Sequence, residues 1–254
     1  DYLPERDDDF FRRFTWSKFS SDEWLLCPPV VSLGGDGAMY DIGFQNLSRA
    51  LMSGMPIKIL VVDTQVYSNT GGQQSKATPL GASAKFAIAG KATRKKDLGL
   101  LAMAYGHVYV AQVGMQSHPE QTVRAMLEAE RHPGPSLLIA HSPCIAHGYD
   151  LVHSPTQQRR AINSGAWPLY RFDPARVALG EAPLLLDSGE PTLDLADYMA
   201  GEARFRMVEL RSPERYRALL AAAQDAAAQR RALYEQLSHV HLPKLHLPPE
   251  TPHG

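Results

Sequence analysis

Small polar residues follow two apolar runs of the sequence, at a spacing that suits a metal ion and a diphosphate. The first group is Gly35-Asp36-Gly37, after the run "PVVSL" at 29–33. Glycines let backbone N–H groups approach a phosphate closely, and the N-terminus of a following helix favours negative charge. Asp36 would repel a bare diphosphate unless a cation such as Mg²⁺ lies between them. Read alone, the tripeptide is more often just a simple turn.

The second group lies in "VVDTQVYSNTGGQ" at 61–73, after the apolar run "IKILVV" at 57–62. Thr64 offers a hydroxyl to a cation, and Val66 offers a backbone carbonyl, which needs no special side chain. Asn69 offers an amide that can donate to a phosphate or a carboxylate. Without the first group, this stretch would be interpreted as a polar surface loop.

The elements that must position these residues follow from the apolar pattern. Short β-rich runs that are apolar on both faces alternate with helical patterns, which predicts an α/β fold with a doubly wound parallel sheet and right-handed crossovers. The carboxyl ends of parallel strands share one edge, so Asp36 and Thr64 are predicted to meet there. The predicted strands are 29–33, 57–62, 107–113 and 136–141, and the predicted helices between them are 41–54, 95–106 and 117–132.

Two helices carry signals at their ends. Ser117 is the predicted N-cap of helix 117–132, with Glu120 three residues on. Ser212 is the predicted N-cap of an Ala-rich helix over 212–240, with Pro213 in its first turn. The stretch 179–199 looks irregular. The residues expected to repeat at the helical rhythm of 117–132 are Val123, Met126, Leu127 and Glu130.

Changes in composition along the sequence predict that the chain has three parts. Residues 1–28 form an N-terminal segment that continues from a longer polypeptide, because they begin without Met and with the acidic "DYLPERDDDFF", unlike a signal peptide. Residues 29–174 form the binding domain. Residues 175–254 form a C-terminal helical arm that ends in a Pro- and His-rich tail.

Composition narrows the class of protein. The chain has 254 residues, of which 44% are hydrophobic, and a formal net charge of −1. This is ordinary for a globular protein and gives no support to nucleic acid as a partner. Two cysteines, Cys27 and Cys144, favour a reducing cytoplasm over a disulfide framework. No apolar run approaches the roughly 20 residues that span a bilayer.

A family resemblance rests on these motifs. Gly-Asp-Gly, 26 intervening residues and the polar Thr64 resemble the thiamine diphosphate motif, in which many enzymes carry Asn at the last place. With "YDIG" at 40–43 and "DTQVYSNTGGQ" around Thr64, the chain resembles the C-terminal thiamine-binding region of pyruvate:ferredoxin (flavodoxin) oxidoreductases. Further matching stretches are "SKATPLGASAKFAIAGK" (75–91), "HPGPSLLIAHSPCIAHG" (132–148) and "SGAWPLYRFDP" (164–174).

The resemblance implies a thiamine diphosphate-binding fold and a role for each matching residue. Asp36, Thr64 and the Val66 carbonyl are implied to bind Mg²⁺, and Asn69 is implied to face the 2-oxoacid and assist catalysis. The residues implied to contact thiamine diphosphate are Gly35, Asp36, Gly37, Ala38, Thr64, Gln65, Val66, Tyr67, Ser68 and Asn69.

Cys144 is implied to be the last ligand of a [4Fe–4S] cluster. By itself, a lone cysteine after a strand is more typical of a buried thiol. A cubane needs four cysteines, so the other ligands are expected outside this chain. Cys27 matches no ligand position and is interpreted as structural.

The activity that the resemblance implies is oxidative decarboxylation of pyruvate to acetyl-CoA and CO₂, with electrons passing through iron–sulfur clusters to ferredoxin or flavodoxin. The implied partners are the pyrimidine-binding and iron–sulfur domains of the same enzyme, coenzyme A, and a second copy in a homodimer. Two alternatives remain: a non-catalytic module with a thiamine-type fold, and the same chemistry on another 2-oxoacid, such as 2-oxobutyrate or 2-oxoglutarate.

A basic cluster, "KATRKK" at 91–96, is interpreted as a solvated face, the usual place of a charge run. The alternative is a contact with coenzyme A phosphates or an acidic ferredoxin. His141, His147 and His153 near Cys144 lack the spacing of a zinc site and are interpreted as structural or loop residues.

Overall fold

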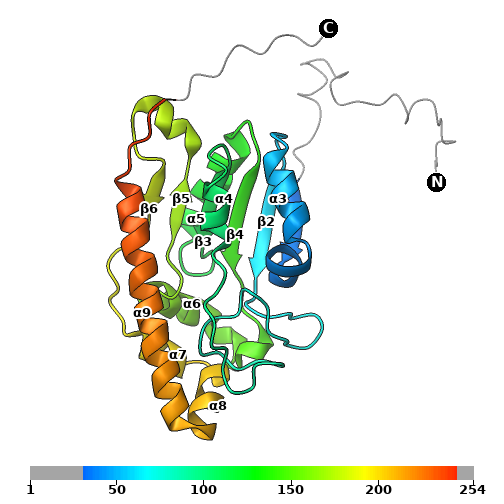
Figure 1. Ribbon diagram of the computed structural model, residues 1–254, viewed down its shortest axis with the longest axis vertical. Coiled ribbons are helices and arrows are strands. Elements are labelled where there is room, and N and C mark those ends of the chain that lie inside the picture. Colours follow the sequence, from blue (N-terminus) through cyan, green and yellow to red (C-terminus); the bar gives the residue numbers. More distant parts are fainter. Residues whose placement is uncertain (1–30, 245–254) are drawn as a thin grey trace, which may run out of the picture. The chain divides into compact units, whose positions relative to one another are not determined.

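The computed structural model describes residues 31–244, and they are built on one six-stranded sheet (Figure 1). The first four strands in sheet order run parallel, and the last two pairings are antiparallel. The predicted α/β class with a largely parallel sheet is therefore confirmed. In sheet order the strands are β1 (Val31–Gly35), β2 (Lys58–Asp63), β4 (Ser136–His141), β3 (Tyr109–Val113), β5 (Tyr170–Phe172) and β6 (Leu184–Leu186).

Helices cover both faces of the sheet. One face carries α3, α4 and the long C-terminal α9, whose apolar residues join one core cluster with those of the sheet. The other face carries α5, whose small residues pack on a separate cluster around Leu138. The connections through α3 and α4 lead across the sheet in one direction, and the connection through α5 leads back. Right-handed crossovers therefore place α5 on the face opposite to α3 and α4. The bounds are α3 (Phe44–Met52), α4 (Leu98–Met103), α5 (Pro119–Arg131) and α9 (Pro213–Ser238).

The predicted helix 117–132 needs two corrections. The helix α5 begins at Pro119 after His118, with no side-chain cap, because the Ser117 hydroxyl donates to Gln158 instead. The predicted apolar rhythm does not mark the buried face, since Val123 and Leu127 are exposed. The face toward the sheet consists of Thr122, Ala125 and Ala129. Small side chains let the helix axis approach the strands.

The other predicted helices are shorter than the pattern suggested. The range 41–54 splits into a π-helical segment η2 (Gly37–Ile42) and α3, and the range 95–106 keeps helical geometry only in α4, after an Asp97 cap. The stretch 179–199 is not wholly irregular, because it contains β6 and the start of α7. The remaining elements are η3 (Ile145–His147), η4 (Leu151–His153), α6 (Ser154–Asn163), η5 (Pro174–Leu179), α7 (Leu195–Ala200) and α8 (Ala203–Arg211).

The long C-terminal helix begins as predicted. The Ser212 hydroxyl accepts from the Arg215 backbone N–H, and Pro213 is the first residue of α9. This helix lies beside β6 and packs Tyr234 against Tyr170 of β5 (Figure 1). The division at residue 174 stays a prediction, and the N-terminal segment, Cys27 and the tail beyond residue 244 lie outside the described residues. Within residues 31–244, no helix is long and apolar enough to cross a membrane.

Candidate functional site

Three oxygens from two loops converge at the carboxyl edge of the parallel strands. Asp36 follows β1, and Thr64 and Val66 follow β2, the strand beside it. The Thr64 Oγ1 lies 2.7 Å from Asp36 Oδ1 and 3.0 Å from the Val66 carbonyl oxygen. The prediction that the two polar groups meet at one edge therefore agrees with the geometry.

These oxygens suit Mg²⁺ by spacing and by chemistry. Oxygens on neighbouring corners of an octahedron lie about 3.0 Å apart when the Mg–O bonds are about 2.1 Å. The Asp36 carboxylate and the Val66 carbonyl are both acceptors, and the Thr64 hydroxyl is the donor that lies between them. Burial and then the nearby Asp63 raise the pKa of Asp36, against hydrogen bonds from Ser75 and Thr64. A cation at this point would stabilise the charged carboxylate.

A second hydroxyl, missed in the sequence, completes the surroundings of Asp36. Ser75 Oγ donates to Asp36 Oδ2 over 2.6 Å and is itself buried. It belongs to the long connection between β2 and α4, which is drawn in cyan beyond the ends of the strands (Figure 1). In the sequence, Ser75 was noted only as part of the stretch 75–91 that resembles the family. That resemblance does not predict where the Ser75 side chain points.

Gln65 gives the turn between the two ligands its shape. Its φ is +62°, a left-handed conformation that is uncommon for a residue other than glycine. The backbone is held on both sides: its N–H donates to Asp63 and its carbonyl accepts from Thr78. The Gln65 side chain turns away from the ligand oxygens, and its Oε1 accepts from the buried Arg204 over 2.6 Å. Its predicted cofactor contact is therefore limited to the backbone.

Close packing explains one of the two glycines of the first group. A Cβ on Gly37 would lie 2.4 Å from the ring of Tyr67, whereas one on Gly35 would meet nothing within 4 Å. Gly37 thus lets the turn after β2 lie directly against the segment after β1. Ala38 is exposed at the start of η2, which leaves its predicted place beside the cofactor open to solvent.

The tip of the second loop carries Ser68 and Asn69, both exposed. The Tyr67 N–H donates to the Gln73 carbonyl and the Gly72 N–H donates to the Tyr67 carbonyl, which closes the loop behind them. The side chain of Asn69 has no hydrogen bond among the residues that the structure describes, and the predicted catalytic amide is therefore free to meet a substrate.

Cys144 lies against this tip, after the neighbouring strand β4. Its Sγ is 3.1 Å from Ser68 Oγ and accepts from the Ala146 backbone N–H over 3.4 Å. A sulfur with two donors beside it fits a metal-bound thiolate. The structure therefore brings Cys144 together with the predicted thiamine-binding turn, although they are 76 residues apart in sequence.

A buried histidine also joins the two turns. His147 Nε2 donates to the Thr64 carbonyl over 2.7 Å. Burial first, and then the charge of Arg204, hold the pKa of His147 well below its usual range, so the ring is neutral near pH 7. This supports the structural interpretation of His147. Across the described part of the chain, no three His, Cys, Asp or Glu side chains gather in a way that could hold a metal ion.

The basic cluster at 91–96 is mostly not a solvated face. Lys91 is buried and Lys95 is partly buried. Lys91 Nζ donates to the carbonyls of Ser75 and Thr78 and so fixes the connection that carries Ser75. Lys95 pairs with Asp63, the last residue of β2. A charge run indicates solvent only when no buried carbonyl or carboxylate lies within reach.

Comparisons with known proteins support the family resemblance. Residues 25–140 match the family described as thiamine pyrophosphate enzyme, C-terminal TPP binding domain. The pyruvate-flavodoxin oxidoreductase of Rhodospirillum rubrum is 54% identical over 86% of this chain. The pyruvate:ferredoxin oxidoreductase of Moorella thermoacetica is 47% identical over 85%, and the pyruvate-flavodoxin oxidoreductase of Trichormus variabilis 50% identical over 85%. The resemblance predicted from the motifs is confirmed.

The relatives are much longer than this chain. The matched region makes up 18% of each of these three proteins. The chain therefore corresponds to one part of proteins that contain further domains.

Proposed function

We propose that this chain, which resembles the thiamine-binding region of pyruvate-flavodoxin and pyruvate:ferredoxin oxidoreductases, binds thiamine diphosphate through Mg²⁺ in an enzyme that oxidises a 2-oxoacid. The observation that carries the proposal is that Thr64 Oγ1 lies within 3.0 Å of both Asp36 Oδ1 and the Val66 carbonyl oxygen at the carboxyl edge of the sheet. In open α/β sheets this edge is where ligands bind.

The residues of this chain hold and orient the cofactor. The three oxygens bind Mg²⁺, and the glycine turn at 35–37 brings backbone N–H groups near the diphosphate. Asn69, exposed at the loop tip, donates its amide to the 2-oxoacid. Thiamine diphosphate supplies the electron sink for decarboxylation when it is bound.

Cys144 supplies one ligand of a [4Fe–4S] cluster in the same proposal. Its position beside Ser68 of the thiamine turn supports a cluster close enough to the cofactor for electrons to leave by that route. Since a cubane takes four cysteines, the other three come from elsewhere in the enzyme. The electrons then reach ferredoxin or flavodoxin, and coenzyme A receives the acyl group.

The remaining parts of the proposal rest on the relatives and on composition. Pyruvate is the substrate that the names of the three relatives give. The pyrimidine-binding domain and the iron–sulfur domains are the partners of this chain, in a homodimer. The low cysteine content supports a cytoplasmic location. The domain division at residues 28 and 174 is part of the same proposal.

The alternative substrates differ in the group that follows the 2-oxoacid unit. A solved 2-oxoglutarate:ferredoxin oxidoreductase from Magnetococcus marinus aligns with 46% of this chain at 24% identity and a TM-score of 0.44. A likeness of that size says nothing about the substrate here. The alternative of a non-catalytic module is disfavoured by the intact set Asp36, Thr64 and Asn69.

Calorimetry tests the cofactor site directly. Thiamine diphosphate is titrated into the full natural polypeptide that contains this chain, with and without Mg²⁺. We expect binding to require Mg²⁺ and Asp36→Ala to weaken it by at least about tenfold, the loss seen even for outer-shell groups. The matched control is Asp225→Ala, which removes an exposed carboxylate from α9. Equal binding by Asp36→Ala and Asp225→Ala would overturn the proposal.

A further inference from the structure

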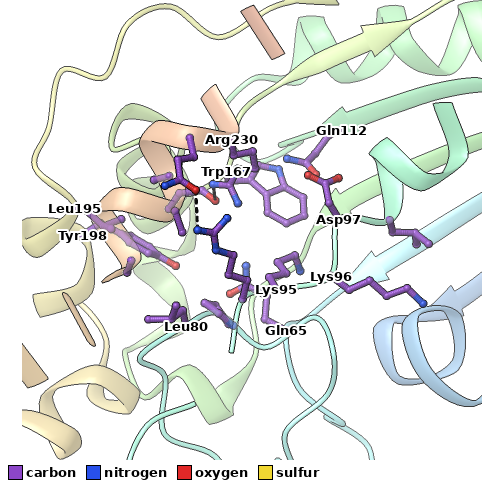
Figure 2. A pocket seen from close by; sticks show the side chains of 18 of the residues that line it. Gln65, Leu80, Lys95, Lys96, Asp97, Gln112, Trp167, Leu195, Tyr198 and Arg230 are labelled. Atoms are coloured by element: carbon purple, nitrogen blue, oxygen red, sulfur yellow. Dashed lines mark hydrogen bonds between the residues drawn. The ribbon is translucent and has the colours of Figure 1, made fainter. Parts of the chain in front are cut away.

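A cavity of about 390 Å³ lies between α9, α7 and the segment that leads into α4 (Figure 2). This is within the size range of small-molecule sites, about 300–1,000 Å³. The cavity is distinct from the proposed magnesium site, because Asp36, Thr64 and Val66 do not line it. Gln65 is the member of that turn that reaches it, with the side chain that faces away from the ligand oxygens.

The walls of the cavity are mostly apolar. On one side α9 presents Ala223, Ala226 and Ala227, at the i, i+3, i+4 spacing of one helix face. The rings of Trp167 and Tyr198 also line the cavity (Figure 2). The short alanine side chains leave this space open where larger apolar residues would have filled it.

The charges around the cavity are unbalanced. Its lining contains four cations, Arg94, Lys95, Lys96 and Arg230, but only one carboxylate, Asp97. That carboxylate already accepts from the Leu100 backbone and from a tyrosine hydroxyl of α9. Lys96 Nζ points elsewhere and donates to the Tyr40 carbonyl.

Two of the cations, Lys95 and Arg230, are partly buried where they line the cavity. Arg230 Nη2 donates to the carbonyls of Gly165 and Ala166, while its buried Nε has no acceptor in the described region. Burial lowers the pKa of Lys95, its partner Asp63 opposes this, and the charge of Arg230 lowers it further. Both cations line the cavity, and the Arg230 guanidinium keeps an N–H without an acceptor among the described residues.

We propose that this cavity binds an organic anion with an apolar body, of the class of medium-chain carboxylates, whose charge lies at Lys95 and Arg230 and whose body lies along the alanine face of α9. The carboxylate takes a hydrogen bond from the Arg230 guanidinium and adds negative charge to a mostly cationic lining. The apolar body covers walls that the chain itself leaves without contacts. This proposal is independent of the thiamine site.

Octanoate is the probe, with octanamide as its neutral counterpart, and binding to the full natural polypeptide is measured by calorimetry. We expect octanoate to bind at least about tenfold more tightly than octanamide, the ratio that a charge-assisted hydrogen bond supports. Ala226→Phe fills the cavity and should abolish binding. Ala228→Phe, an exposed alanine of the same helix outside the lining, should leave binding unchanged.

The outcomes separate the possibilities. If octanoate does not bind, or binds no better than octanamide, the anion site does not exist. If Ala226→Phe binds as tightly as Ala228→Phe, the probe lies elsewhere and the proposal is wrong. Circular dichroism reports whether each variant keeps its helices, and Ala226→Leu, a smaller filling, replaces the Phe variant if that one unfolds and should also abolish binding. Arg230→Gln should weaken octanoate by about tenfold and leave octanamide unchanged.

Discussion

At the scale of single residues, the hydroxyl of Ser68 connects two cofactors that the proposed function brings together. It is exposed at the tip of the loop after β2, and its Oγ lies 3.1 Å from the sulfur of Cys144. Hydrogen bonds to ligand sulfurs are among the properties that set the potential of an iron–sulfur cluster, because they stabilise the added negative charge. Ser68 is therefore expected to raise the potential of the cluster that Cys144 binds.

Ser68→Ala is predicted to lower that midpoint potential. The loss of one hydrogen bond, roughly 0.5–1.5 kcal/mol, corresponds to about 20–60 mV for one electron. An anaerobic redox titration of the full enzyme, followed by electron paramagnetic resonance, measures it. Thr70→Ala is the control, because the Thr70 hydroxyl in the same loop donates to Gln73 instead. An unchanged potential in Ser68→Ala would contradict the prediction, and a cluster that survives Cys144→Ala would contradict the ligand assignment.

His141 is predicted to make the stability of the fold depend on pH. The ring is fully buried, neither nitrogen has a partner among the described residues, and burial lowers its pKa from 6.5 to about 4. The unfolded chain therefore binds this proton more readily, so stability falls as the pH drops from 6.5 to about 4. His141→Phe keeps the packing on Trp167 and should remove this part of the slope, worth roughly 3 kcal/mol.

Denaturant titration at pH 7 and at pH 4.5 tests the prediction, with the two unfolding free energies compared within each protein. His153→Phe, which changes an exposed histidine of η4, is the control and should keep the slope of the original protein. If His141→Phe loses as much stability on acidification as the control does, the buried ring does not cause the effect.

At the scale of elements, a buried polar network connects the turn around Gln65 to the helices α6 and α8. Arg204 at the start of α8 pairs with Glu202 and donates to Gln65. Gln157 of α6 donates to the other oxygen of Glu202. The left-handed conformation of Gln65 is thus held by side chains from two helices, which is how a strained backbone persists at a site.

Arg204→Met should cost about 3–5 kcal/mol of unfolding free energy, because it leaves Glu202 buried without its partner. The double change Arg204→Met with Glu202→Leu should recover most of that stability, since a buried ion pair replaced by apolar groups is often neutral. Thiamine diphosphate binding should stay weak in both, because Gln65 lacks its anchor in both. Denaturant titration and calorimetry give the two readouts. Full binding by the double variant would show that the anchor is unnecessary.

The sequence predicted the elements whose residues show a clear apolar pattern. It missed those whose conformation depends on contacts with other parts of the chain. The strands β2, β3 and β4 were found because most of their residues are buried and apolar, whereas β1 was found from its apolar residues although the strand is largely exposed. The two strands of the antiparallel pairings, of three residues each, are too short to show a period. The buried face of α5 was assigned wrongly because alanine and threonine carry little hydrophobic signal, while its exposed flank is rich in larger apolar residues.

The same distinction applies to the site. Asp36, Thr64 and Val66 could be brought together from the sequence, because strand order alone places both loops at one edge. Ser75, Lys95 and His147 could not, since their roles depend on the path of irregular segments. The direction of the Gln65 side chain also depends on Arg204, which is 139 residues away in sequence.

At the scale of the whole molecule, the described chain holds one half of the proposed active site. Its two cysteines cannot supply the four ligands of a cubane. We therefore expect the 254-residue chain by itself not to reduce viologen with pyruvate and coenzyme A, while the full natural polypeptide does. An anaerobic viologen assay of both proteins, with the same cofactors added, measures this. Turnover by the short chain would contradict the prediction.

The anchor of Gln65 by Arg204 has a consequence for the order in which the site matures on the ribosome. The three oxygens proposed to bind Mg²⁺ belong to residues translated before residue 67, but Arg204, whose guanidinium fixes their turn, comes 139 residues after Gln65. At synthesis rates of about 5–20 residues per second, that delay is roughly 7–28 s. During this interval the turn around Gln65 lacks its hydrogen bond from Arg204. Cofactor binding during translation would therefore have to wait until α8 has been made.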